Sequence, residues 1–113
     1  MRLTSDFWVK ALIRRIFGCG EFAVVEKHGS AEAGAIFIRA RDKSGLETLF
    51  APAPQSFFDA AKPQDRTFER RLDKCQAQDI DALLLKEKNF DPDFWVVEIE
   101  TDRPEDYISI MLS

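Results

Sequence analysis

Histidine and cysteine are scarce in this 113-residue chain, which has one histidine, His28, and two cysteines, Cys19 and Cys75. A zinc site needs three or four converging nitrogen or sulfur ligands, and the acidic residues form no EF-hand calcium loop. We therefore expect neither a metal nor a cofactor. The two cysteines are far apart in the sequence, and without a secretory signal we expect them to be reduced, mostly buried thiols.

Long apolar runs are also missing. The opening segment, MRLTSDFWVKALIRRIF, is interrupted by Asp6, Lys10, Arg14 and Arg15. These charges come too often for a membrane-spanning helix, and the segment lacks the continuous apolar stretch and small-residue cleavage site of a signal peptide. We therefore expect a soluble, cytoplasmic protein that does not enter a membrane.

An excess of positive charge is lacking as well, because the net charge is −4 and the isoelectric point is about 5.0. Residues 1–57 hold eight Lys or Arg against six Asp or Glu, whereas residues 58–113 hold eight against fourteen. Binding to a nucleic-acid backbone needs a basic face. Nucleic acid is therefore not an expected partner, and only the first half could carry a local basic patch.

Apolar residues are plentiful, since 45% of the chain is hydrophobic and ten residues are phenylalanine. A chain of this length can bury about two thirds of its surface in one core. We therefore expect residues 1–113 to form a single domain.

The first half predicts one helix followed by strands. Thr4 or Ser5 can cap a helix that runs to Phe17 and ends at the following glycines. Its apolar residues cover so much of the circumference that we expect it to be mostly buried. Three segments rich in strand-forming residues follow, and their short connections predict a three-stranded antiparallel meander within residues 22–53. The three predicted strands are 22–26, 35–41 and 46–50.

The second half predicts a further helix and strand. Residues 79–89 have helical periodicity, and residues 94–100 alternate as a strand does. Residues 67–74 suit either a helix or a polar edge strand, and we favour the strand. Residues 107–112 could form a last strand or a tail, and the pair Phe57-Phe58 is a candidate for an exposed apolar patch. The predicted fold class is α+β, with helices packed on a sheet.

Four segments resemble a known family. In order they are LTSDFWVKALIRR, AEAGAIFIR, LFAPAPQS and FDPDFWVVEIE, and they are similar to a family of short alphaproteobacterial proteins called domain of unknown function 1491. The resemblance covers residues 1 to about 100. It implies a bacterial, cytoplasmic protein, and it supplies no catalytic or binding residues.

Arginines are candidates for an anion site. Arg39 and Arg41 share one face of the strand 35–41, about 6.6 Å apart along it. Arg14 lies in the polar stripe of the first helix, so the guanidiniums could converge where that helix packs on the sheet and hold a carboxylate or phosphate. The favoured alternative is that each arginine lies in solvent or pairs with a neighbouring carboxylate. The neighbours considered are Asp42, Glu47 and Glu98.

The turn at residues 28–34 carries two further candidates, His28 and Glu32. Glu26 and His28 alternate onto one strand face, so the carboxylate could orient the imidazole. Glu26 or Glu32 could also serve as a base. A lone histidine at a strand end is more often a solvated turn residue, and this interpretation is favoured.

The scarcity of catalytic residue types favours a non-catalytic interaction or assembly module over an enzyme. Its expected partner is another protein or a further copy of the chain, contacted through the acidic stretch 91–106 or the apolar residues 107–112. The alternative is a small enzyme or binding protein for an anionic metabolite, which would use the candidate site residues. These are Arg14, Arg39, Arg41, His28 and Glu32.

Overall fold

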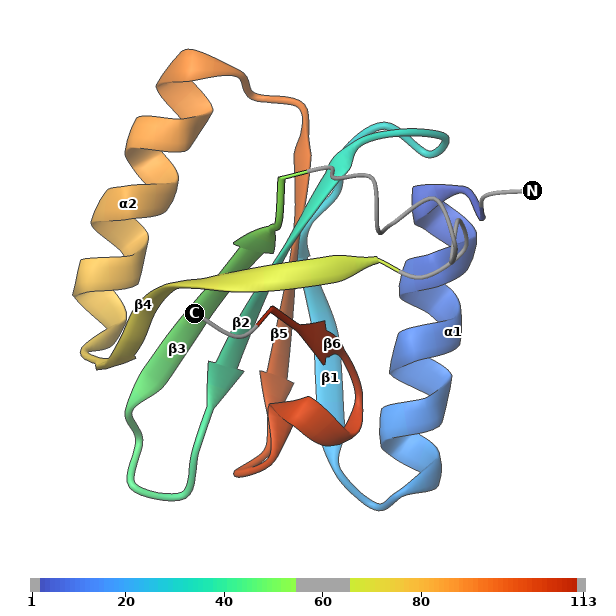
Figure 1. Cartoon of the computed structure of the whole chain (residues 1–113), viewed down its shortest axis with the longest axis vertical. Helices are drawn as coiled ribbons and strands as arrows, with labels where there is room; N and C mark the ends of the chain where they lie inside the picture. The colour runs from blue at the N-terminus through green and yellow to red at the C-terminus, as the bar shows by residue number, and fades with distance from the viewer. Residues whose placement is uncertain (1–2, 55–65, 112–113) are drawn as a thin grey trace.

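The computed structural model describes residues 3–54 and 66–111. Their helices and strands are arranged as two layers of helix around one sheet (Figure 1). In chain order the elements are α1 (Ser5–Gly18), β1 (Phe22–Lys27), β2 (Ala35–Arg41), β3 (Glu47–Pro52), β4 (Thr67–Cys75), α2 (Ala77–Phe90), β5 (Phe94–Glu100), the 3-10 turn η2 (Pro104–Asp106) and β6 (Ser109–Ile110). The predicted α+β class is confirmed.

The sheet is mixed, and its strand order within the described residues is β1-β5-β2-β3-β4-β6. β5 runs antiparallel to β1 and parallel to β2, whereas β2, β3 and β4 are antiparallel neighbours. The predicted meander over residues 22–53 is therefore wrong, because β5 separates β1 from β2. The connection 28–34 can extend over about 20 Å, which is enough to cross the roughly 10 Å of two strand spacings.

The two helices cover opposite faces of the sheet. Along β2, Ile36 and Ile38 point to α1 whereas Phe37 and Arg39 point to α2, as strand alternation requires. The α1 side holds the larger core, which includes Trp95 and other side chains from several strands. Its members are Val9, Leu12, Ile16, Ala23, Ile36, Ile38, Ala40, Phe50, Phe68, Trp95, Val97, Ile99, Tyr107 and Ile108.

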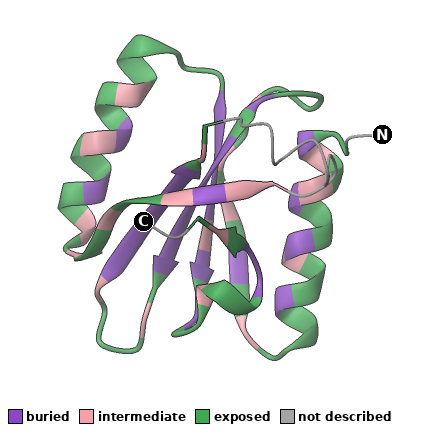
Figure 2. Cartoon of the chain, in the orientation of Figure 1, coloured by how far each residue is buried: buried purple, intermediate pink, exposed green. Residues whose placement is uncertain are grey.

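The core on the α2 side is smaller. Its members are Phe37, Leu49, Ala51, Ile80, Leu84, Phe94 and Val96. Figure 2 shows the central strands buried, while each helix keeps an exposed outer side. β5 contributes side chains to both cores, which is why this largely apolar segment takes an interior position in the sheet.

α1 begins and ends where the sequence predicts. The Thr4 hydroxyl accepts a hydrogen bond from the backbone N–H of Phe7, and Asp6 lies in the positive first turn. The helix is less covered than predicted, because only the stripe containing Val9, Leu12 and Ile16 is buried. Phe7 and Phe17 lie off this stripe and are 60% and 51% exposed.

Trp95 holds the crossing connection against the end of β5. Its indole Nε1 donates to the carbonyl of Ser30 at 2.9 Å, and the His28 ring packs on the indole with 5.1 Å between ring centroids. Gly29 lies so close that a Cβ there would be 2.8 Å from the Phe94 carbonyl carbon. A glycine is needed at this position because the connection passes directly over the β5 backbone.

Residues 67–74 form a strand, as favoured from the sequence, and β4 continues to Cys75. Ser109 and Ile110 of the last segment form the strand β6, which pairs in parallel with the start of β4 within the same chain. Beyond that pairing β4 has register shifts and charged side chains, which are features that discourage pairing with another chain.

No helix of the described residues is both long and apolar enough to cross a membrane. The pair Phe57-Phe58 lies outside the described residues.

The Gly29→Ala substitution is expected to lower the free energy of unfolding by about 1–3 kcal/mol, because the added methyl group overlaps the β5 backbone and the Trp95 ring. Gly18→Ala is the matched control, since nothing lies within 4 Å of a Cβ there. Urea denaturation of both variants measures the difference. Equal stability of the two variants would contradict the close approach.

Candidate functional site

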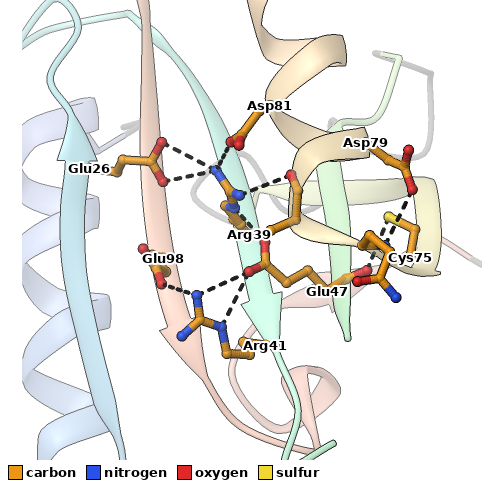
Figure 3. A network of polar contacts seen from close by, with 10 residues as sticks. Glu26, Arg39, Arg41, Glu47, Cys75, Asp79, Asp81 and Glu98 are labelled. Carbon is orange, nitrogen blue, oxygen red and sulfur yellow. Dashed lines mark hydrogen bonds and ion pairs between the residues drawn. The ribbon is translucent and has the colours of Figure 1, made fainter. Parts of the chain in front are cut away.

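A network of charged side chains lies on the sheet face that carries α2, with Arg39 at its centre (Figure 3). Arg39 Nε donates to Glu47 Oε1 at 2.5 Å, and Nη1 lies 2.8 Å from Asp81 Oδ1. Nη1 is also 3.3 Å from both carboxylate oxygens of Glu26, while Nη2 donates to the Ala77 carbonyl at 3.2 Å. Every guanidinium nitrogen of Arg39 therefore has an acceptor from the chain itself.

Arg41 extends the network along β2. Its Nε and Nη2 donate to Glu47 Oε2 at 3.2 and 3.1 Å, and Nη2 lies 3.4 Å from Glu98 Oε1. The strand register places Glu47 directly opposite Arg41 on β3. Glu98 is beside Arg39 on β5, and the Arg41 side chain reaches it from two residues further along β2. The favoured alternative names Asp42, Glu47 and Glu98 as partners or leaves the arginines in solvent. Glu47 and Glu98 are among the actual partners, whereas Asp42 pairs with Lys74.

The centre of the network is buried. The side chains of Arg39 and Glu47 are 8% and 1% exposed, whereas those of Glu26 and Asp81 are 38% and 62% exposed. Burial alone would lower the pKa of Arg39, but its hydrogen bonds to Glu47 and Asp81 outweigh this effect and raise that pKa. Arg39 stays charged, and its role is to tie β1, β2, β3 and α2 together.

Glu26 is the carboxylate that β1 contributes to the network. Burial raises its pKa above the usual 4.5, and repulsion from Glu98, Asp81 and Glu47 adds to this effect. The charge of Arg39 acts in the opposite direction without reversing the shift. The contact between Glu26 and Arg39 is therefore an ion pair that does not compensate for the surroundings of the carboxylate.

The two cysteines differ in exposure. Cys75 is partly buried, its thiol donates to the Glu47 carbonyl at 3.4 Å, and burial raises its pKa. Both effects favour the protonated thiol over a nucleophilic thiolate. Cys19 is exposed at the end of α1, so the expectation that both thiols are mostly buried is wrong for this one. Among the described residues the cysteines are not joined in a disulfide.

A second feature lies where α1 meets β1. The Phe17 and Phe22 rings contact edge to face, with 5.7 Å between centroids, and are 51% and 44% exposed. Val24 follows on the same face of β1 and is 41% exposed. We call Phe17, Phe22 and Val24 the Phe17–Phe22 surface. It borders an open hollow of about 540 Å³, whose lining is Phe17, Gly20, Glu21, Phe22, Arg41, Asp42, Lys43, Glu100, Thr101 and Asp102.

The family model described as "Protein of unknown function (DUF1491)" matches residues 3–109. The chain belongs to this family. The resemblance noted from the sequence is thus confirmed, and the family has no assigned activity.

Solved structures of DUF1491 relatives have the same fold. A protein from A. tumefaciens, known from a solution structure, is 49% identical, with coverage of 100% of this chain and 98% of that one and a TM-score of 0.87. A crystal structure of a family member from Caulobacter crescentus is 34% identical, covers 99% and 100%, and has a TM-score of 0.77. Among curated proteins, none matches this chain.

The predicted site residues are not brought to one place. Arg39 and Arg41 share the network, but Arg14 is exposed on α1, which covers the opposite face of the sheet. The convergence of Arg14 with the strand arginines, which is the less favoured of the two sequence interpretations, is therefore not found. His28 is exposed in the connection that follows β1, and its ring packs on Trp95. Glu32 is exposed, and its carbonyl accepts the Ser5 N–H at the start of α1.

No group of three or more His, Cys, Asp or Glu side chains within residues 3–54 and 66–111 is arranged to hold a metal ion. The feature that the sequence interpretation missed is the Phe17–Phe22 surface. Phe17 does not share the helical stripe of Leu12 and Ile16, and this difference in phase was the available signal.

A double-mutant cycle on the buried ion pair measures its coupling. Arg39→Met and Glu47→Met are each expected to lower the free energy of unfolding by about 3–5 kcal/mol, because each takes from a buried charge the buried partner closest to it. The double variant should lose about 1–3 kcal/mol less than the sum. The exposed pair Asp6–Lys10 is the control, with an expected coupling below about 0.5 kcal/mol. Equal coupling in both cycles would show that burial does not strengthen the Arg39 pair.

Glu26→Gln should make the protein slightly more stable at pH 7, by less than about 1 kcal/mol, because the carboxylate is partly exposed. The folded protein holds a proton on Glu26 at higher pH than the unfolded chain does, so ionisation of Glu26 opposes folding. The advantage of the variant should therefore shrink as the pH falls towards 4.5. Urea titrations between pH 4.5 and 8 measure it, with Glu32→Gln as the baseline. An advantage that grows on acidification would contradict the raised pKa.

Proposed function

We propose that this chain is a non-catalytic module of the bacterial cytoplasm that binds another protein through the Phe17–Phe22 surface. The observation that carries the proposal is the pair of exposed aromatic rings in contact with each other beside an open hollow. Aromatic side chains gathered at the surface are enriched at protein interfaces.

The surface is suited to an interface because its side chains are already ordered. Phe17 and Phe22 limit each other's rotation through their edge-to-face contact. Val24 extends the apolar area along β1. Rings fixed in this way lose little side-chain entropy on binding. The hollow beside them can receive a side chain of the partner, which is how binding hot spots are commonly built.

The polar groups support a binding role over a catalytic one. All three guanidinium nitrogens of Arg39 already contact acceptors of the chain, so no two of them are free to form a fork around a substrate anion. Arg41 directs two of its nitrogens to Glu47. The Cys75 thiol is held in its protonated form. These groups contribute to the folded structure in ways that a reaction would disturb.

The test is a double substitution, Phe17→Ser with Phe22→Ser. Both side chains are about half exposed, so the free energy of unfolding should change little, while partner binding should be lost. The measurement is quantitative capture of proteins from the lysate of the native organism, followed by binding curves for each purified partner.

The matched control is Leu85→Ser with Phe90→Ser, which removes two exposed apolar side chains of α2 that are 60% and 88% exposed. A partner that binds both double variants equally would contradict the proposed surface. Light scattering of the unmodified chain checks the alternative of self-assembly, for which the Phe17–Phe22 variant would have to change the mass.

A further inference from the structure

We infer that the segment bound at the Phe17–Phe22 surface is a short peptide stretch with an apolar residue flanked by lysine or arginine. This inference rests on the proposed function, and it adds the chemistry of the partner. It follows from the charges around the hollow, which are not balanced within the described part of the chain.

The basic side chains of the hollow are already paired. Arg41 contacts Glu47 and Glu98, and Lys43 lies 3.8 Å from Asp102. The acid Asp42 is paired as well, since Lys74 Nζ donates to it at 2.7 Å. The opposite charges within each ion pair cancel, so these side chains present little net charge to a ligand.

Glu21 and Glu100 are the exceptions. Within residues 3–54 and 66–111 neither carboxylate has a salt-bridge partner, although both line the hollow. Arg41 is beside Glu100 in the β2–β5 pairing, but its ion pairs are with Glu47 and Glu98. The Tyr107 hydroxyl donates to Glu21 Oε1 at 2.5 Å, and this hydrogen bond keeps the phenol protonated by raising its pKa. Arg15 in turn donates to the Tyr107 carbonyl. Glu21 is therefore fixed in place by a hydrogen bond and not by an ion pair.

The positions of these carboxylates define the pattern of the ligand. Glu100 is directly opposite Phe22 in the β1–β5 pairing, and Glu21 precedes Phe22 in the chain. Opposite residues have Cβ atoms about 4.5–5.5 Å apart. The Phe22 ring thus shares one hollow with two acidic side chains, which suits an apolar side chain with a cationic neighbour on either side.

A second copy of the chain is a poorer occupant. In a two-fold dimer each Phe17–Phe22 surface would face its own copy, which would bring the Glu21 and Glu100 carboxylates of both copies together. Like charges brought together oppose association. A stable interface also needs about 800 Å² from each partner, and three side chains provide only the centre of such an area. A short basic and apolar segment fits both the charge and the size.

The experiment uses two blocked synthetic peptides, Lys-Ala-Leu-Phe-Ala-Lys and its counterpart with glutamate at both ends. Binding to the full chain labelled with ¹⁵N is followed by chemical shifts at residues 17–24 and 98–102. The lysine peptide should bind at least about 10-fold more tightly, which corresponds to two ion pairs of about 0.7 kcal/mol each. Its affinity should fall as the salt concentration rises.

Three variants separate the causes. Glu21→Gln with Glu100→Gln should remove the preference for lysine, whereas Glu32→Gln with Glu105→Gln, which removes the same charge elsewhere on the surface, should keep it. Phe22→Ser should weaken both peptides. Loss of preference in the Glu32 and Glu105 variant would overturn the inference, because net charge alone would explain the selectivity.

The outcomes also distinguish the inference from the proposed function. If both peptides bind equally and shift the same residues, the Phe17–Phe22 surface stands and its preference for basic segments is wrong. If neither peptide shifts these residues, both the surface and the inference are overturned.

Discussion

The ion pair between Arg39 and Glu47 constrains the whole α2 face of the sheet. Two charges taken out of water cost several kcal/mol each unless their hydrogen bonds are satisfied. Here Glu47 accepts hydrogen bonds from both Arg39 and Arg41, while Asp81 and the Ala77 carbonyl contact the two Nη atoms of Arg39. Because two of these acceptors come from α2, the buried guanidinium also fixes where the first turns of that helix lie. Figure 3 shows how the acceptors surround it.

The insertion of β5 between β1 and β2 makes this arrangement possible. In a simple meander β1 would lie beside β2, and Glu98 would not be next to Arg39 in the sheet. With β5 in between, Glu98 reaches Arg41 while Glu26 still reaches Arg39 from β1. The crossing connection is held by Trp95, so packing on the α1 face maintains the strand order on which the charged α2 face depends.

Local features could be predicted from the sequence because local chemistry determines them. The Thr4 cap locates α1, and the short loop after Arg41 fixes the β2–β3 register that brings Glu47 to the arginines. Strand order could not be predicted, because it depends on competition between distant segments for the interior of the sheet. The separation of Arg14 from the strand arginines could not be predicted for the same reason, since nothing local specifies which face of the sheet α1 covers.

The side chains discussed above fall into two groups, according to how far they are exposed and whether they have a partner within the chain. Arg39 and Glu47 are buried and matched, so their polarity is fully used within the fold. Phe17, Phe22 and Glu100 are in the opposite condition, because the rings are half exposed and the carboxylate has no ion pair within the described ranges. Exposed rings add little to the stability of an isolated domain, and an uncompensated carboxylate beside them adds none. Their joint placement at one hollow is best explained by a contact outside the chain that is both apolar and cationic.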